Sequence, residues 1–211
     1  KIFPDLPLIL IEHGTDLPKN NEKTFQAKKH ITIVFLGAGA LNKGILDFIK
    51  LSQDKRLKGK FIWKIIGGIN YKLIDESGFS RALEGLKQIG SYKLNKLPDI
   101  LKKEGADLVI IPSNTPETYS YTLSESIQAN IPVIGRDIGA LGERIKKYKA
   151  GWTFKNYENA VKLLKNLYQN QTLIADKLKQ LGNVEIYKSS EMSKLYKDLY
   201  IKQMLKKKNK I

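Results

Sequence analysis

The residues with the most chemical potential lie between positions 112 and 125. Two carboxylates, Glu117 and Glu125, are separated there by seven residues, and Pro116 precedes the first. Each carboxylate accepts two hydroxyl hydrogen bonds, so one could hold a ribose diol and the other a hexose. The backbone N–H groups between them would open a helix and bind a diphosphate or sugar hydroxyls; they belong to Ser120, Tyr121 and Thr122. The residue types of this segment therefore suit a sugar nucleotide.

A purely structural explanation of these residues also stays open. The spacing Thr122-x-x-Glu125 is that of a capping box, in which the glutamate side chain bonds back to the Thr122 backbone. Glu117, which follows Pro116, could be a solvated loop acid. Local sequence alone does not decide between the two interpretations.

A second candidate is the glycine-rich turn at 35–44, which leads from a predicted strand into a predicted helix. Gly37 and Gly39, with Ala38 between them, would let the backbone approach a phosphate, and the helix start would present free N–H groups. Lys43 would add a positive charge at that helix start. Because a lysine there opposes the helix dipole, a bound anion would relieve an unfavourable arrangement. The alternative is a glycine-rich turn with a surface lysine.

Two common nucleotide motifs fit this turn poorly. In the dinucleotide fingerprint a third glycine would stand at the position of Asn42, and an acidic residue would end the second strand, where Gly67 and Gly68 stand instead. A Walker A loop would end Gly-Lys-Ser/Thr, whereas this turn ends Lys43-Gly44-Ile45. We therefore expect neither NAD nor P-loop chemistry, and no cofactor.

The elements that must position these residues alternate along the chain. Apolar, β-rich stretches predict strands at 31–36, 61–66, 107–111, 131–134 and 152–154; helical periods separate them at 44–51, 80–87, 97–104, 122–130 and 141–148. Nearly continuous apolar strands separated by helices indicate an α/β fold with a Rossmann-like, doubly wound parallel sheet and helices on both faces. Such a sheet binds ligands beyond the carboxyl ends of its strands, where both candidate loops lie. From about 156 onward the pattern is helical.

We expect one nucleotide-sugar-binding domain at 21–185. Residues 1–20 would be a linker or strand from an N-terminal domain that this sequence lacks, because the chain starts at Lys1 and 7–12 looks like the tail of a strand or linker. Residues 186–211 would form a C-terminal helix and basic tail, with a frayed helix end at 202–210.

The composition limits the classes of function. The chain has 211 residues, no cysteine and two histidines, so thiolate and histidine-rich metal sites are excluded and a reducing compartment fits. The net charge is +16, and four of the 37 basic residues are arginines. Scattered lysines fit a lysine-biased proteome best; attraction to phosphate-bearing ligands or to an anionic membrane surface stays open. Specific nucleic-acid binding, which favours arginine, is not expected. The longest apolar runs are strand-sized and too short to span a membrane.

Several motifs in order resemble the carboxy-terminal domain of family 4 (group 1) glycosyltransferases. The pair Glu117-x7-Glu125 follows a strand that ends in Pro-Ser. The resemblance covers about residues 13–152, and the other motifs are Phe35-x-Gly37 with Lys43-Gly44, Ala106 to Ser113, Pro132-Val133 and Gly139-Ala-x-x-Glu143.

The resemblance implies two facing Rossmann-like domains (the GT-B fold) and metal-free transfer of a sugar with retained anomeric configuration. By this resemblance Lys43 contacts the donor diphosphate, Glu125 holds the ribose and Glu117 acts as the catalytic carboxylate beside the sugar. The backbone at Tyr119 to Thr122 binds sugar hydroxyls or phosphate, and Gly90, Ser91 and Tyr92 lie near the nucleobase. The implied donor carries UDP, GDP or dTDP. The acceptor, a glycan or lipid-linked sugar, would bind the absent domain, in the cytoplasm or at the inner face of the plasma membrane.

The sequence departs from the family pattern at two places. An arginine usually follows the first glycine of the phosphate loop, and Ala38 stands there instead. Losing such a cation could remove roughly 2–3 kcal/mol of transition-state stabilisation, so a degenerate, non-catalytic binding module is the alternative. The usual Gly-Phe-Gly is Thr118-Tyr119-Ser120, a form associated with enzymes that build bacterial surface polysaccharides.

Overall fold

The computed structural model describes residues 9–20 and 23–208 of the 211-residue chain. It divides into two compact units. One is Leu17–Val184; the other consists of the described parts of Lys1–Asp16 and Glu185–Ile211. The sheet and both candidate loops belong to Leu17–Val184.

Six parallel strands form one sheet in the order β3-β2-β1-β4-β5-β6. The strands are β1 (Ile31–Leu36), β2 (Phe61–Ile66), β3 (Lys87–Gln88), β4 (Leu108–Ile111), β5 (Val133–Arg136) and β6 (Gly151–Phe154). The chain starts in the middle, winds outward through β2 and β3, and then returns to wind the other way from β4. The predicted doubly wound sheet is confirmed, and its switch point lies between β1 and β4, where ligands bind in such folds.

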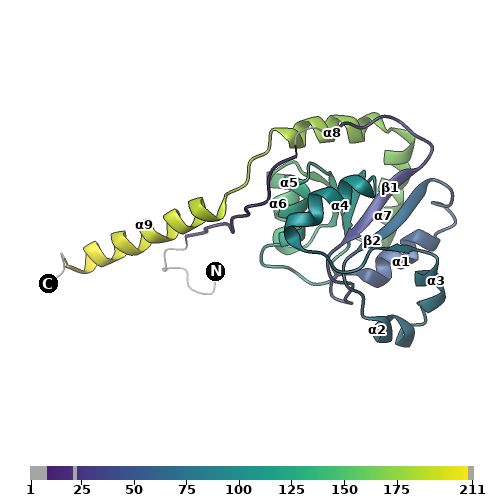
Figure 1. Cartoon of the computed structure of the whole chain (residues 1–211), viewed down its shortest axis with the longest axis horizontal. Helices are drawn as coiled ribbons and strands as arrows, with labels where there is room; N and C mark the ends of the chain where they lie inside the picture. Colours follow the sequence, from purple (N-terminus) through teal and green to yellow (C-terminus); the bar gives the residue numbers. More distant parts are fainter. Residues whose placement is uncertain (1–8, 21–22, 209–211) are drawn as a thin grey trace. The chain divides into compact units, whose positions relative to one another are not determined.

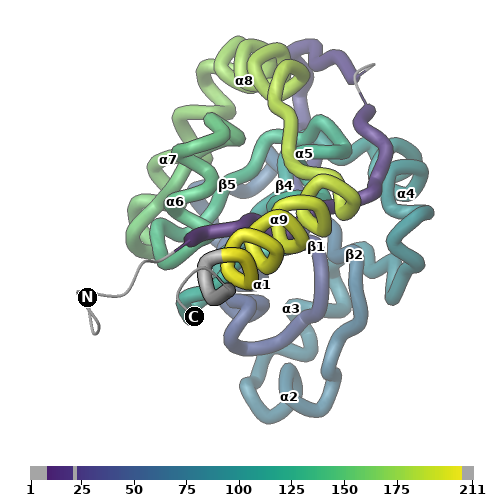
Figure 2. Tube along the Cα trace, turned by 90° about the vertical axis from the view of Figure 1, so that its left-hand side faces the viewer, coloured from purple at the N-terminus to yellow at the C-terminus, as the bar shows by residue number. Residues whose placement is uncertain are grey.

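Helices cover both faces of this sheet, as predicted (Figure 1). They are α1 (Ile45–Gln53), α2 (Tyr71–Glu76), α3 (Ser80–Glu84), α4 (Leu97–Lys103), α5 (Tyr121–Gln128), α6 (Gly139–Lys147), α7 (Tyr157–Gln169) and α8 (Thr172–Gly182), with a 3-10 turn at Leu94–Lys96. Ile33 and Phe35 of β1 pack with Phe48 of α1 and Leu164 of α7 in the main core. Helices α4, α5 and α6 cover the opposite face. Figure 2 shows α2 and α3 at one end of the layers and α7 and α8 toward the other.

The predicted helix at 80–87 was wrong in its second half. Helix α3 ends at Glu84, and Gly85, which has the weakest helix propensity after proline, follows it. Lys87 and Gln88 then pair with β2 as the edge strand β3, which the sequence analysis missed. Helix α2 was missed as well, although Asn70 accepts a hydrogen bond from the Leu73 N–H in a normal N-cap.

The prediction that everything after 156 is helical holds only in part. Helix α8 ends at Gly182, and residues 183–188 form no regular structure before α9 (Ser189–Lys208) begins. In the unit made of the chain ends, Thr15 N–H donates to the Tyr187 carbonyl oxygen at 2.8 Å. Residues 9–20 form no strand. Positions 7–8 and 209–210 lie outside the described residues. None of the described helices is both long and apolar enough to span a bilayer.

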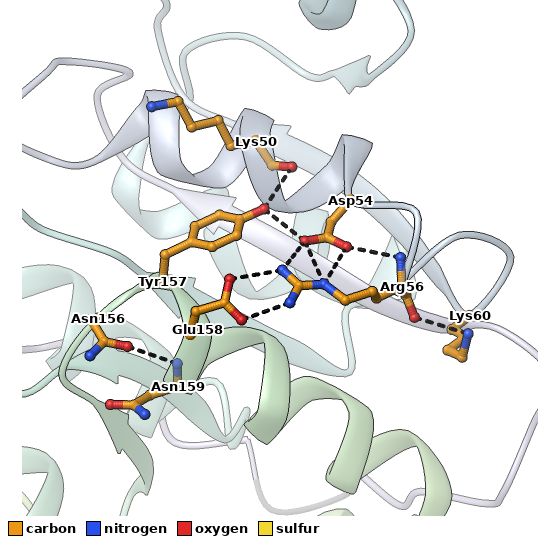
Figure 3. A network of polar contacts seen from close by, with 8 residues as sticks. All are labelled: Lys50, Asp54, Arg56, Lys60, Asn156, Tyr157, Glu158 and Asn159. Atoms are coloured by element: carbon orange, nitrogen blue, oxygen red, sulfur yellow. Dashed lines mark hydrogen bonds and ion pairs between the residues drawn. The ribbon is translucent and has the colours of Figure 1, made fainter.

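A polar network joins the loop after α1 to the start of α7 (Figure 3). The Arg56 guanidinium donates to both oxygens of Asp54 and to both oxygens of Glu158. Tyr157 donates its hydroxyl to Asp54 at 3.0 Å. These bonds hold the pKa of Asp54 far below its ordinary value. The network therefore fixes one side of the fold, and it shares no residue with the two candidate loops.

Candidate functional site

The loop after β1 and the start of α5 lie against each other at the carboxyl edge of the sheet. A side chain on Gly37 would approach Thr122 Oγ1 to 3.4 Å, and Gly37 has φ +104°, a left-handed value that favours glycine. Gly39 N–H donates to the Gly68 carbonyl oxygen at 2.8 Å, which adds the loop after β2. The first candidate turn and the helix that contains Glu125 thus meet, as the sheet topology predicted.

The position of Lys43 depends on its neighbour Gly44. Gly44 is the N-cap of α1 with φ 78°, and a side chain on it would overlap the Pro112 carbonyl. This close approach brings the β1 loop against the loop after β4, where Lys43 Nζ lies 2.9 Å from Glu117 Oε1. The backbone N–H of Asn114 also donates to the Asn42 carbonyl oxygen at 2.9 Å. Lys43 and Glu117, 74 residues apart in sequence, form one ion pair.

Glu117 is not a solvated loop acid. Its side chain is only 13% exposed, against 39% for Lys43. Ser113 Oγ donates to the same carboxylate oxygen at 2.6 Å. Burial alone would raise the pKa of Glu117, but the hydrogen bonds from Ser113 and Lys43 outweigh it and hold the pKa below its ordinary value. Glu117 is therefore ionised at neutral pH in the free chain.

Glu125 does not close a capping box. Helix α5 begins at Tyr121 with Ser120 as N-cap, so Thr122 already lies inside the helix, and no side chain caps this helix. Glu125 instead accepts a hydrogen bond from the Tyr92 hydroxyl at 3.4 Å. Burial raises the pKa of Glu125, partly offset by that hydrogen bond, and burial also raises the pKa of Tyr92. The structural alternative for Glu125 was wrong.

The segment at 90–92 comes to the same edge of the sheet. Gly90 (φ 78°) forms an isolated bridge with Gly67 at the end of β2, and a side chain on Gly68 would meet Ser91 Oγ at 2.9 Å. Tyr92 then reaches Glu125. One of the three predicted nucleobase residues, Tyr92, is thus in direct contact with the second glutamate, although the two are 33 positions apart in sequence.

Ser120 has an uncommon backbone conformation at the start of α5. Its φ of 70° lies in the left-handed region, which is costly for a residue with a side chain. Its hydroxyl is buried near Glu117 without a hydrogen bond of normal geometry. The residues on either side differ: Tyr119 is buried, whereas Tyr121 is 56% exposed.

The sequence analysis missed one residue of this region, Arg144. Arg144 of α6 is 5% exposed and donates to the carbonyl oxygens of Tyr119 and Ser120, at 2.8 and 3.1 Å. Its guanidinium carbon lies 3.7 Å from the centroid of the Tyr119 ring. The only available signal was that Arg144 is one of four arginines among many lysines.

Comparison with sequence families gives one match that covers most of the chain. The model described as "Glycosyl transferases group 1" matches residues 16–185. Those residues include every candidate site residue. No curated protein matched the chain in a sequence search.

Several solved structures have a similar fold. Sucrose-phosphate synthase from Thermosynechococcus elongatus has a TM-score of 0.69 at 13% identity, over 93% of this chain and 53% of that one. HepE from Anabaena, in complex with UDP and glucose, has a TM-score of 0.63 at 14% identity, over 82% and 48%. WaaG, a glycosyltransferase involved in lipopolysaccharide biosynthesis, has a TM-score of 0.61 at 16% identity, over 80% and 46%. At these identities the likeness shows the fold, and the chain spans about half the length of these proteins.

Proposed function

The chain belongs to the group 1 glycosyltransferases, and from that premise we propose that it is the donor-binding half of a retaining enzyme that uses a nucleoside-diphosphate sugar. Its Rossmann-like fold is that of GT-B glycosyltransferases. The proposal depends most on one observation, the Lys43–Glu117 pair, which lies at the carboxyl edge of the sheet beside the start of α5. A cation, a carboxylate and a helix N-terminus together suit a ligand that carries both phosphate and hydroxyl groups.

Each part of the site has a role in this proposal. Lys43 binds the donor diphosphate, with the turn at Gly37, Ala38 and Gly39 beside it. Glu125 accepts hydrogen bonds from the ribose, and the segment at 90–92 lies against the base. Glu117 faces the transferred hexose, together with the backbone at 119–122. The contact between Tyr92 and Glu125 supports this order along the ligand, because base and ribose are covalently adjacent.

The mechanism requires stabilisation of a departing nucleoside diphosphate while the sugar develops positive charge. Lys43 and the first N–H groups of α5 would supply this as preorganised electrostatics. Ala38 offers no second cation, and this favours the alternative of a non-catalytic module with the same fold. Loss of activity in a Lys43 variant of the complete enzyme would favour transfer; unchanged activity would favour the module.

The acceptor and its setting are also proposals. We place the acceptor, a glycan or lipid-linked sugar, on a facing domain outside this chain, so the chain alone should bind nucleotide with little or no transfer. The fold likeness to WaaG and the Glu-Thr-Tyr-Ser-Tyr sequence support a role in bacterial surface polysaccharide synthesis. That role would place the protein in the cytoplasm, with contact to the inner face of the membrane favoured by its net charge of +16.

Calorimetric titration of the chain with UDP, GDP and dTDP tests the proposal directly. We expect one of the three to bind with one-to-one stoichiometry. The absence of heat with all three at millimolar concentration would overturn the proposed function.

Replacing Glu117 with glutamine should strengthen nucleoside-diphosphate binding. The free chain holds Lys43 against the Glu117 carboxylate, which competes with the diphosphate for that cation and also repels it. Removing the negative charge should raise the affinity about three- to tenfold. The gain should be smaller for the sugar nucleotide, since Glu117 would also lose its contact with the sugar.

Calorimetry of this variant is best compared with Glu158→Gln, which removes an equal charge in the polar network of Figure 3. That control should bind as the wild type does. Unchanged or weaker binding by Glu117→Gln would show that the carboxylate does not compete with the diphosphate.

A further inference from the structure

Arg144 contacts the backbone at Ser120, which has an unfavourable backbone conformation. Ser120 has φ 70° and ψ 85°, and a non-glycine residue keeps such a conformation only when its surroundings enforce it. The two carbonyl groups that flank Ser120, its own and that of Tyr119, both accept from Arg144 Nη1. Arg144 Nη2 donates to Ser124 Oγ at 2.9 Å, one turn further along α5. The guanidinium therefore fixes both peptide groups around the strained residue.

The direction of these bonds sets the direction of the N–H groups. In a trans peptide the C=O and the following N–H point in opposite directions. Because the carbonyls of Tyr119 and Ser120 point toward Arg144 of α6, the N–H groups of Ser120 and Tyr121 point away from it. The Gly37 turn lies against Thr122, which is about 200° around α5 from Ser124, the helix residue that Arg144 contacts.

Aromatic packing holds the guanidinium itself in place. Arg144 stacks on the Tyr119 ring, and the Tyr119 hydroxyl is hydrogen-bonded to Ser124 Oγ at 3.1 Å. Arg144, Tyr119 and Ser124 thus form a closed set of contacts behind the start of α5. A planar fork with several donors can make these bonds together, and a lysine ammonium cannot.

We propose that Arg144 is a positioning residue for the donor: it holds the peptide groups around Ser120 so that their N–H groups face the diphosphate and sugar. This inference rests on the proposed function of the site, and it assigns to α6 a part in donor binding. Arg144 is buried behind the loop and acts only through the backbone that it holds.

The test compares binding of two ligands to four variants of the full chain. The ligands are whichever of UDP, GDP and dTDP the wild type binds and the corresponding nucleoside, titrated by NMR, which measures millimolar affinities. The variants are Arg144→Met, Arg144→Lys, the double variant Arg144→Met with Ser120→Gly, and Arg56→Met. Arg56 is the control because it also makes several side-chain hydrogen bonds, but in the network of Figure 3.

We expect Arg144→Met to weaken diphosphate binding about tenfold or more and nucleoside binding by less than about twofold. The lysine variant should show an intermediate loss and covers the case in which the methionine variant does not fold. Glycine at position 120 adopts a positive φ without strain, so the double variant should recover several-fold of the lost affinity. Arg56→Met should bind both ligands as the wild type does.

Two results would overturn the inference while the proposed function stands. One is unchanged diphosphate binding by the Arg144 variants. The other is an equal loss for diphosphate and nucleoside, which would indicate a general structural role. If the wild-type chain binds none of the three nucleotides, the proposed function fails and the inference fails with it.

Discussion

Replacing Lys43 with methionine should weaken nucleoside-diphosphate binding on the order of 100-fold. A charge-assisted hydrogen bond from a lysine to phosphate contributes about 1.5–3 kcal/mol. A 100-fold change in affinity corresponds to about 2.8 kcal/mol, near the upper end of that range. Position 38 is an alanine, so no arginine there can bind the diphosphate in place of Lys43. The affinity for the nucleoside alone should stay within about twofold, because Lys43 lies beside Glu117 rather than beside the Tyr92–Glu125 contact.

The matched control is Lys58→Met. Lys58 is exposed just before β2, at the amino end of the strands, so its replacement removes the same charge at the opposite edge of the sheet. Calorimetry should show near wild-type binding for this variant. Equal losses for the two lysines would mean that the net charge of the chain, rather than a defined site, attracts the nucleotide. Unchanged binding by Lys43→Met would remove Lys43 from the site.

The sheet could be predicted because its central strands are buried on both faces. Every residue of β1 and β4 is buried, and their sequences are nearly continuous apolar runs, interrupted only by Thr32 of β1. The edge strand β3 has no such signal: it is two polar residues, Lys87 and Gln88, held by backbone pairing with β2. Short or polar elements depend on neighbours that are distant in sequence, and local patterns do not report them.

The same distinction applies to the candidate site. Glycine positions such as Gly37 and Gly44 could be read from the sequence, since left-handed turns favour that residue type. The sequence predicts that the loops of Lys43 and Glu117 lie at the same edge of the sheet, because both follow strands. It does not predict that the two side chains form an ion pair. The role of Arg144 could not be predicted, because it depends on how α6 packs beside α5. Glycine would suit position 120, because Ser120 adopts a positive φ.

Replacing Glu125 with alanine should weaken nucleotide binding on the order of 100-fold, because the ribose loses its hydrogen bonds to a half-buried carboxylate. The sharpest form of the experiment varies the ligand as well. If UDP or GDP is the natural nucleotide, the wild type should bind it much more tightly than its 2′,3′-dideoxy analogue. In Glu125→Ala the two should bind alike, since the group that distinguishes them is gone. Tyr92→Phe, which keeps the carboxylate, should preserve most of the preference.

The pH dependence gives a second, independent measure of the same carboxylate. Burial raises the pKa of Glu125, so it takes up a proton at a higher pH than an exposed glutamate does. Because the charged form accepts the ribose hydrogen bonds, affinity should fall as the pH is lowered from 7 toward 5. The pKa of Glu117 is lowered, so that residue stays charged over this range and does not contribute the same slope. The slope should become smaller in Glu125→Gln, where only the part that comes from protonation of the terminal phosphate remains. A Glu125 variant with the full wild-type pH slope and an unchanged preference for ribose would show that Glu125 does not touch the nucleotide.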